Sequence, residues 1–342
     1  MMTKPKIYEE PELTEPVDLC LPGGRLNPEA VGWSRYPLHH CNLSGSPLRK
    51  KRWNYWAIAK NDFLFSATLS DIDYLGLAFV YFLDFKTKEF HELTVTRPFG
   101  HGIELGNYVN SDTCFDDSRL KMAFTNKKSI TAIQVESPDF QGKKLTADLS
   151  VYTPPQHQTL NVTIPWSNRR FQFTSKQNTL PVEGIVTIGD KKYRADGGYG
   201  CLDFGRGIWP YSISWNWASA SGKSGAHLIG LNFGAGWTEG TGMNENGICI
   251  DGRLSKISED LTFAFDPADY MKPWEIHTTL SDRVAVTLTP FYERVAGTNA
   301  IILKSEMHQL IGYISGKVKD DEGNTYTLDN LTGWAEYHLA RW

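Results

Sequence analysis

Short runs of apolar and aromatic residues, separated by turn residues, are the feature that most limits the fold of this chain. Residues 53–59 and residues 63–69 flank a turn at residues 60–62, and the segment 75–95 repeats this arrangement. Runs of this length with such turns between them are typical of β-hairpins. Sustained helical periodicity is scarce, so we predict an all-β protein with few short helices. Regular strands at this spacing favour antiparallel barrels or sandwiches.

The chain has 342 residues, enough for about two domains, and a repeated motif agrees with that number. The motif WNYW at residues 53–56 and the motif WNW at residues 215–217 each open a strand that is followed by a turn and a return strand. Two barrel-like halves joined in the segment 165–181 explain the repeat, and coincidence between two Trp-rich strands is the alternative. We predict an N-terminal arm over residues 1–28, a first β-barrel-like domain over 29–175 and a second over 176–342.

Charge and composition argue against several classes of protein. The net charge of −4 does not suit a surface built for nucleic acid. The five cysteines are scattered without a C-x-x-C pair, so neither a disulfide framework nor a zinc ribbon is expected. No apolar run approaches the roughly 20 residues of a membrane-spanning helix, and the N-terminus does not resemble a signal peptide, so we expect a cytoplasmic protein. Phosphate-loop, dinucleotide and metal-ligand motifs are missing, and we expect no cofactor and no metal.

One run of basic residues stands directly before Trp53. It consists of Arg49, Lys50, Lys51 and Arg52. Four cations beside aromatic residues suit a phosphate or a lipid headgroup, and would then give peripheral membrane contact. The alternative is a strand entry at which the side-chain stems cover apolar surface.

The segment 194–245 is the richest in candidate site residues. Because side chains alternate in direction along a strand, residues 211–218 present two different faces. One face carries Tyr211, Ile213, Trp215 and Trp217, and the other carries Ser212, Ser214, Asn216 and Ala218. An aromatic wall with a few polar groups nearby is typical of a ligand-binding barrel mouth. The alternative is that the tryptophan face belongs to an ordinary core.

Charged residues flank this hairpin, and Asp203 is the first candidate for chemistry. A carboxyl buried beside tryptophan rings has a raised pKa and can act as a general acid near neutral pH. A cation formed next to the rings gains about 0.5–2 kcal/mol from each ring face. The alternative for Asp203 is a structural ion pair with Arg206 at a glycine-rich corner.

Several motifs, in order along the chain, resemble the domain of unknown function family 2804. They are GRLNPEAVGWSR, KRWNYWAI, LDFGRGIWPY, SWNWASASG and GWAEYHLARW, and the resemblance extends from about Leu21 to Trp342. The chain is more distantly similar to the double-barrel lipocalin-like (calycin) proteins that include carotenoid 1,2-hydratase and AttH-like proteins. This resemblance implies two β-barrel domains and an oily ligand. It also implies addition of water across an isoprenoid double bond by acidic and basic side chains, without a cofactor.

These observations lead to one hypothesis and two open alternatives. The hypothesis is binding of a hydrophobic lipid or isoprenoid in a Trp-lined pocket of the second half, with cofactor-free hydration or isomerisation in which Asp203 and His227 move the proton. The ligand contacts are predicted to be Trp209, Tyr211, Trp215, Asn216, Trp217, Asn232 and Glu239. The alternatives are a lipid carrier without chemistry, and a carbohydrate-binding or carbohydrate-modifying β protein, because tryptophan also stacks on sugars.

Overall fold

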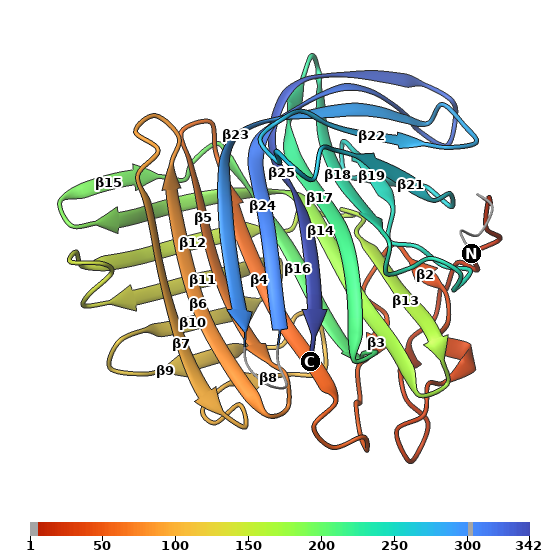
Figure 1. Ribbon diagram of the computed structural model, residues 1–342, viewed down its shortest axis with the longest axis horizontal. Coiled ribbons are helices and arrows are strands. Elements are labelled where there is room, and N and C mark those ends of the chain that lie inside the picture. The colour runs from red at the N-terminus through yellow and green to blue at the C-terminus, as the bar shows by residue number, and fades with distance from the viewer. Residues whose placement is uncertain (1–5, 300–303) are drawn as a thin grey trace.

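The computed structural model describes residues 6–299 and 304–342, and its regular structure is almost entirely β (Figure 1). The helix within the described residues is one short 3-10 turn, η1 (Pro28–Ala30). A short parallel pair, β1 (Val17–Asp18) with β3 (His39–His40), forms its own two-stranded sheet. The all-β prediction is confirmed, and two large antiparallel sheets make up the rest of the molecule.

The first large sheet has 14 strands within the described residues. Its main path runs in the order β7 (Phe90–Pro98), β6 (Leu75–Asp84), β5 (Phe63–Asp71), β4 (Lys50–Ala59), β16 (Gly198–Ile208), β14 (Arg170–Ile188), β12 (Leu145–Tyr152), β11 (Ile130–Ser137), β10 (Lys121–Lys127), β9 (Thr113–Asp116) and β8 (Glu104–Leu105). Beside this path, β13 (Leu160–Ser167) and β15 (Lys191–Arg194) pair with β14, and β2 (Trp33–Ser34) pairs with β13. The sheet curls around an apolar core that contains Phe65, Phe173 and Phe204.

The second large sheet has nine strands in the part of the chain that the structure describes. Their order is β20 (Arg253–Lys256), β19 (Gly247–Ile250), β18 (His227–Ala235), β17 (Ser212–Ser224), β25 (Thr325–Arg341), β24 (Lys304–Lys319), β23 (Val284–Asn299), β22 (Trp274–Thr278) and β21 (Leu261–Ala264). This sheet also curls around a core of its own, to which β17 contributes Ala218 and Ala220 and β22 contributes Trp274.

The two sheets pack against each other through a third apolar layer. In Figure 1 the long strands β23, β24 and β25 cross in front of β4, β5 and β6. Between them, Ala57 and Tyr81 of the first sheet pack with Trp217, Ile311 and Trp334 of the second. In its central part, residues 217–220, strand β17 therefore buries both of its faces, one in the core of its own sheet and the other between the sheets. A period-2 pattern alone cannot show which of two buried faces lines a site.

The structure divides the chain at a different place from the predicted boundary between residues 175 and 176. That position lies inside β14, which runs unbroken from Arg170 to Ile188 and pairs with β16 along most of its length. The first sheet extends to Ile208, and the second begins with β17 at Ser212. The segment 165–181, predicted as a linker, forms the β13–β14 hairpin instead. Its polar residues suggested a linker, but they are buried in the ladder, as the exposed fraction of 0% for Gln172 shows.

The arm predicted over residues 1–28 is tied to both sheets in its described part, residues 6–28. The hydroxyl of Tyr8 donates to Asp260, and Glu10 forms a buried ion pair of 2.5 Å with Lys256, the last residue of β20. Further along, Leu19 and Leu26 are buried in the core of the first sheet. The arm therefore contributes to packing and does not only run over the surface.

Candidate functional site

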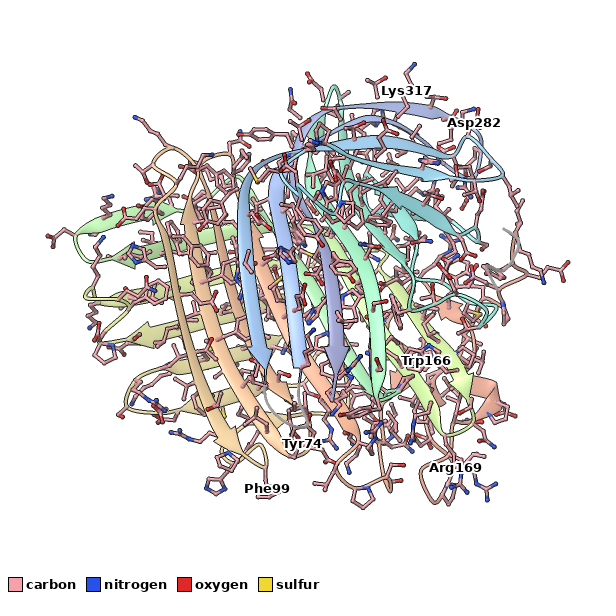
Figure 2. All side chains as sticks on the ribbon, viewed as in Figure 1. Tyr74, Phe99, Trp166, Arg169, Asp282 and Lys317 are labelled. Carbon is pink, nitrogen blue, oxygen red and sulfur yellow. The ribbon has the colours of Figure 1, made fainter. Side chains whose placement is uncertain are left out.

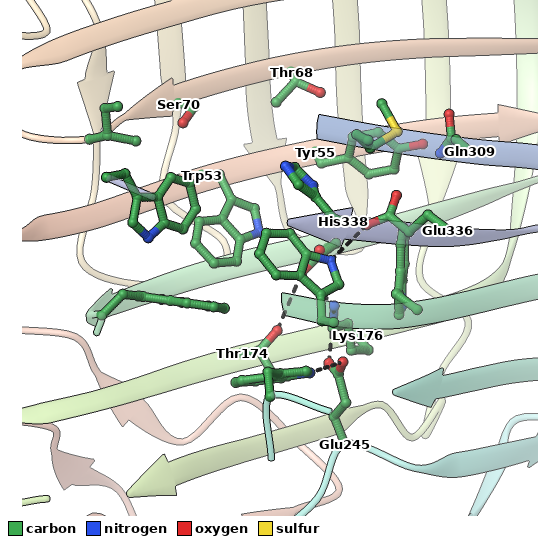
Figure 3. Close-up of a pocket in the computed structure, with 18 of the residues that line it drawn as sticks. Trp53, Tyr55, Thr68, Ser70, Thr174, Lys176, Glu245, Gln309, Glu336 and His338 are labelled. Carbon is green, nitrogen blue, oxygen red and sulfur yellow. Dashed lines mark hydrogen bonds and ion pairs between the residues drawn. The ribbon is translucent and has the colours of Figure 1, made fainter. Parts of the chain in front are cut away.

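A cavity of about 210 Å3 lies between the two sheets (Figure 3). One wall comes from β4, β5, β6, β14 and β16 of the first sheet, and the other comes from β17, β23, β24 and β25 of the second. Six tryptophans line it: Trp53, Trp209, Trp215, Trp217, Trp237 and Trp342. The ionisable side chains in its wall include Lys176, Asp203, Glu245, Arg294, Glu336 and His338. The cavity is therefore built from both halves of the chain, whereas the sequence placed the pocket in the second half alone.

The aromatic side chains of the cavity wall come from alternate residues of two strands. Trp53 and Tyr55 on β4 are two residues apart and both line the cavity, as do Trp215 and Trp217 on β17. Across the cavity the ring centroids of Tyr55 and Trp217 lie 5.9 Å apart in an edge-to-face arrangement. The two Trp-rich strands of the sequence repeat therefore contact each other at the site.

The tryptophans contact one another as well as the cavity. The rings of Trp209 and Trp237 stack with centroids 5.3 Å apart, and the centroid of Trp215 lies 5.7 Å from that of Trp209. The indole nitrogens of two of these tryptophans have side-chain partners: Trp209 donates to Gln172 and Trp237 donates to Glu245. Indoles that are both stacked and hydrogen-bonded make a stiff wall.

A buried ion-pair cluster occupies one side of the cavity. The Nζ atom of Lys176 lies 2.9 Å from Oδ1 of Asp203 and 3.1 Å from Oε2 of Glu245. The same ammonium lies 4.6 Å from the ring centroid of Trp217. Lys176 and Asp203 are direct cross-strand partners in the β14–β16 ladder, which fixes their contact. Although burial disfavours its charge, the two carboxylates hold the pKa of Lys176 above its usual range, so Lys176 remains a cation.

The two carboxyls that Lys176 bridges have different surroundings. Glu245 is 1% exposed, and burial raises its pKa even though Lys176 opposes the shift. Its Oε1 accepts a hydrogen bond of 2.9 Å from Trp237. The side chain of Asp203 is less buried than that of Glu245, and the hydroxyl of Thr174 lies 3.3 Å from its Oδ1. The alternative of an ion pair between Asp203 and Arg206 does not hold, because Arg206 donates to the backbone oxygens of Trp53 and Gly106 and Asp203 pairs with Lys176.

Glu336 is the third carboxyl of the site and stands on the opposite wall. It lines the cavity from β25, and its Oε1 accepts a hydrogen bond of 2.9 Å from the indole nitrogen of Trp215. Desolvation raises its pKa to about 7, with a smaller contribution from the negative charge of Asp203. A carboxyl with this pKa is partly protonated at neutral pH and can donate a proton.

His338 follows Glu336 on the same face of β25. Its ring lies 4.1 Å from that of Trp215, and its Nε2 lies 2.8 Å from the hydroxyl oxygen of Ser305. Burial lowers the pKa of His338 to about 3, and Arg294 adds to the shift. The imidazole is therefore neutral at physiological pH and serves as a hydrogen-bonding group.

The structure brings four of the predicted site residues to the cavity and leaves the other five outside it. Asp203, Trp209, Trp215 and Trp217 line it. Asn232 lies behind Trp217, whose indole nitrogen donates to it over 2.8 Å. Asn216 points to the other face of β17 and donates to the backbone oxygen of Glu336. Tyr211 is 49% exposed, and neither it nor Glu239 lines the cavity.

His227, the fifth residue outside the cavity, does not meet Asp203. His227 pairs with Ser224 at the hairpin end of the β17–β18 ladder, whereas Trp217 pairs with Gly234. Seven residues of strand separate these two pairs, roughly 23 Å at 3.3 Å per residue. His227 is exposed and its Nδ1 lies 2.6 Å from Asp251. Sharing a hairpin with Trp217 was therefore no indication that His227 shares its site.

The basic run does not form the free cationic patch that membrane contact requires. Lys50 pairs with Asp73 at 3.0 Å and Arg52 pairs with Asp71 at 2.9 Å. Lys51 is 1% exposed, and Arg49 donates to the backbone oxygens of Trp342 and Trp209. The interpretation as a strand entry fits better, because all four side chains are engaged within the molecule.

Sequence reasoning missed Lys176, Glu336 and His338, and it noted Glu245 only as a carboxyl flanking the hairpin. A signal existed for two of them: in the motif GWAEYHLARW, the residues Trp334, Glu336 and His338 alternate and so share one strand face. No such signal existed for Lys176, because its partner Asp203 is set by the register of β14 against β16.

Within the described residues, the structure shows neither a cluster of metal-binding side chains nor a membrane-spanning helix. No group of three or more His, Cys, Asp or Glu side chains in residues 6–299 and 304–342 is arranged to hold a metal ion. No helix within the same residues is long and apolar enough to cross a membrane.

These features define a two-sheet β protein with a Trp-lined cavity that holds carboxyls on both walls. The chain belongs to the family described as a domain of unknown function, DUF2804, whose model matches residues 10–342. A search of curated proteins finds no match.

Solved structures share this fold at low sequence identity. CghA with Sch210972 is 11% identical with a TM-score of 0.53, and the match covers 86% of this chain and 89% of that one. Kievitone hydratase from Nectria haematococca is 11% identical with a TM-score of 0.50 and the same coverage. An AttH-like protein from Nitrosomonas europaea is 12% identical with a TM-score of 0.51, over 95% of this chain and 98% of that one.

Proposed function

We propose that this protein binds a small hydrophobic molecule in the cavity between its sheets and converts it by cofactor-free hydration or isomerisation. The observation that carries the proposal is Glu336, a carboxyl whose pKa is raised to about 7 on a wall of tryptophans. A structural carboxyl is usually paired with a cation or exposed to water. Glu336 is instead bonded to the indole of Trp215, which leaves it able to hold and release a proton.

The proposed reaction uses an acid on one wall of the cavity, Glu336, and a carboxylate on the opposite wall, Asp203. The protonated carboxyl of Glu336 gives its proton to one carbon of a double bond; the π electron pair forms the new C–H bond, and the second carbon becomes a cation. The faces of Trp215 and Trp217 stabilise this cation. In hydration a water molecule oriented by Asp203 adds its oxygen to the cation and loses a proton to a carboxylate. In isomerisation the cation instead loses a proton from the neighbouring carbon to the carboxylate of Glu336, which restores the acid. In hydration the proton released by the added water returns from the accepting carboxylate to Glu336 through water.

The cavity volume limits the ligand. An apolar cavity of about 150 Å3 holds one benzene molecule. The present cavity of about 210 Å3 therefore takes a group not much larger than one ring. We infer that the reacting part of the ligand is a single ring or a short isoprenoid unit, and that a long chain lies largely outside the cavity.

The structural neighbours support small-molecule binding. One of them was solved with Sch210972, and another is a hydratase of kievitone. The carbohydrate alternative needs exposed tryptophans at the rim of a pocket, whereas Trp209 and Trp217 are only 3% and 4% exposed. The carrier alternative uses the same cavity and differs in whether the ligand leaves unchanged.

Mass spectrometry of an organic extract of the freshly purified protein supplies the test ligand. The extracted compound is then incubated with the protein in 18O-labelled water. We expect hydration to add one labelled water to the ligand and isomerisation to change its structure without adding label. The Glu336→Gln variant is expected to retain the compound and to lose its conversion, while Glu306→Gln, on the neighbouring strand but outside the cavity, is expected to behave as wild type.

Two outcomes would contradict the proposal. Recovery of an unchanged ligand after incubation with the wild-type protein would support the carrier alternative. Equal conversion by Glu336→Gln and wild type would show that the proton comes from another group.

A further inference from the structure

Lys51 is a buried cation without an anionic partner. Lys51 is 1% exposed, and no carboxylate within the described part of the chain lies within 4.0 Å of its Nζ atom. The ammonium donates one hydrogen bond, of 3.2 Å, to the backbone oxygen of Ile72. It lies 4.7 Å from the ring centroid of Tyr74 and 5.3 Å from that of Trp342. An ammonium has three hydrogens to donate, and a buried charge without a counter-ion is costly.

Strand alternation explains why Lys51 stays unpaired while its neighbours do not. Lys50 and Arg52 point to one face of β4, where they pair with Asp73 and Asp71. Lys51 points to the other face, which two residues further on carries Trp53 in the cavity wall. Lys51 therefore lies on the cavity face of β4, just beyond the end of the aromatic wall.

Three further donors in the same place have no hydrogen-bond partner. They are Nε of Arg49, the hydroxyl of Tyr74 and the indole nitrogen of Trp342, all buried. Arg49 adjoins the group through a hydrogen bond of 3.2 Å from its Nη1 to the backbone oxygen of Trp342. Tyr74 lies at the end of the molecule where β25 finishes (Figure 2). We call Arg49, Lys51, Tyr74 and Trp342 the donor cluster.

The donor cluster adjoins the cavity through Trp342. Trp342 lines the cavity, and so does Ile72, whose backbone oxygen is the hydrogen-bond acceptor of Lys51. The local charge is positive, because neither Arg49 nor Lys51 forms an ion pair with a carboxylate of the described residues. The two nearest acids, Asp71 and Asp73, are occupied by Arg52 and Lys50. Neighbouring buried donors that lack an acceptor indicate the place of an acceptor that the protein chain does not supply.

We propose that the donor cluster binds an anionic oxygen group, such as a carboxylate, sulfate or phosphate, carried by the hydrophobic ligand of the cavity. This inference rests on the proposed function and narrows the ligand to a hydrophobic acid with a compact apolar body. The apolar body lies among the tryptophans, and the acid group accepts hydrogen bonds from Lys51, Trp342 and Tyr74. The acid group also fixes which end of the ligand reaches Glu336.

Calorimetric titration with two matched probes tests the inference. The probes are 3-phenylpropanoate and 3-phenylpropan-1-ol, which share one ring and one carbon chain and differ in the acid group. We expect the wild-type protein to bind the acid at least about tenfold more tightly than the alcohol at pH 7, since charge-assisted hydrogen bonds to a buried cation are strong. Lys51→Met is expected to remove this preference while leaving the affinity for the alcohol unchanged.

Two other variants separate binding from folding. Lys50→Met removes the neighbouring cation, which is paired with Asp73 on the opposite face, and is expected to retain the full preference for the acid. Trp342→Phe keeps an aromatic ring and removes one donor, and is expected to reduce the preference severalfold. If Lys51→Met does not fold, Trp342→Phe still tests whether the donor cluster causes the preference for the acid.

The outcomes that would overturn the inference are distinct. Equal affinity of the wild-type protein for acid and alcohol would remove the donor cluster as an anion site and leave the cavity as a ligand site. Displacement of 3-phenylpropanoate by inorganic phosphate at comparable concentration would show that the cluster takes a free anion and not the acid group of a ligand. Failure of both probes to bind would count against the proposed function itself.

Discussion

The indole nitrogen of Trp215 donates a hydrogen bond of 2.9 Å to Oε1 of Glu336, across two neighbouring strands of the second sheet. In the β17–β25 ladder Trp217 is the direct partner of Glu336, so Trp215 reaches it along the diagonal. The carboxyl is thus held by one tryptophan and placed opposite another. Its surroundings are apolar enough to raise its pKa to about 7, which suits a proton donor at neutral pH.

The first prediction concerns the pH dependence of conversion. Glu336 must be protonated to act as the acid, so we expect the rate of conversion to fall as the pH rises through about 7. The rate of the extracted compound's conversion, measured from pH 5 to pH 9, checks this. A rate that stays constant across this range would exclude Glu336 as the acid.

The second prediction concerns stability and pH. The pKa of Glu336 is higher in the folded protein than its ordinary value of 4.5, so the folded state binds more protons than the unfolded state between those two values. The free energy of unfolding contributed by this group therefore falls as the pH rises from about 4.5 to about 7. We expect Glu336→Gln to lack this contribution, and urea unfolding at pH 5 and pH 8 should show a smaller difference in the variant than in wild type.

The third prediction concerns the buried ion-pair cluster. Lys176→Met leaves Glu245 and Asp203 without their shared cation, and breaking a buried pair in this way costs about 3–5 kcal/mol. Urea unfolding should show this loss, and the loss should shrink at low pH, where protonation removes the charge of Glu245. Lys121→Met, which breaks the exposed pair with Asp116, is the control and should change the stability little. Equal losses in both variants would contradict the importance of burial.

The fourth prediction concerns domain independence. Because Trp217 and Trp334 of the second sheet pack with Ala57 and Tyr81 of the first, the two sheets share one apolar layer. We expect the chain to unfold in a single transition in which tryptophan fluorescence and circular dichroism change together. Two separate transitions would show that each half folds by itself.

The fifth prediction concerns His227, which the sequence paired with Asp203. Its side chain is exposed beside Asp251 and lies outside the cavity. We expect His227→Ala to convert the ligand at the wild-type rate, measured in the same assay as Glu336→Gln. Loss of conversion in His227→Ala alone would restore the sequence-based hypothesis.

The candidate site was only partly predictable from the sequence. Trp215 and Trp217 were identified because a strand places alternate residues on one face, and that rule needs no partner strand. Asn216 was misplaced because the sequence does not say which face of β17 is turned toward the cavity. Asn232 was misplaced because the sequence does not show that this residue of β18 lies behind Trp217. The structure shows that Ala218, on the face of Asn216, belongs to the core of the second sheet. Both faces of this strand are buried over residues 217–220, so the polarity of these residues carried no information about the cavity.

The sequence by itself determined the all-β class, the family and the aromatic strands, because strand length, turn residues and alternation are local properties of the chain. Only the tertiary structure decided that Lys176 meets Asp203 and Glu245, and that Glu336 faces the ion pair from the opposite wall. These contacts depend on strand register and on the packing of one sheet against the other. A shift of register by one residue turns every side chain to the opposite face, and nothing local to residue 176 or 336 fixes that register.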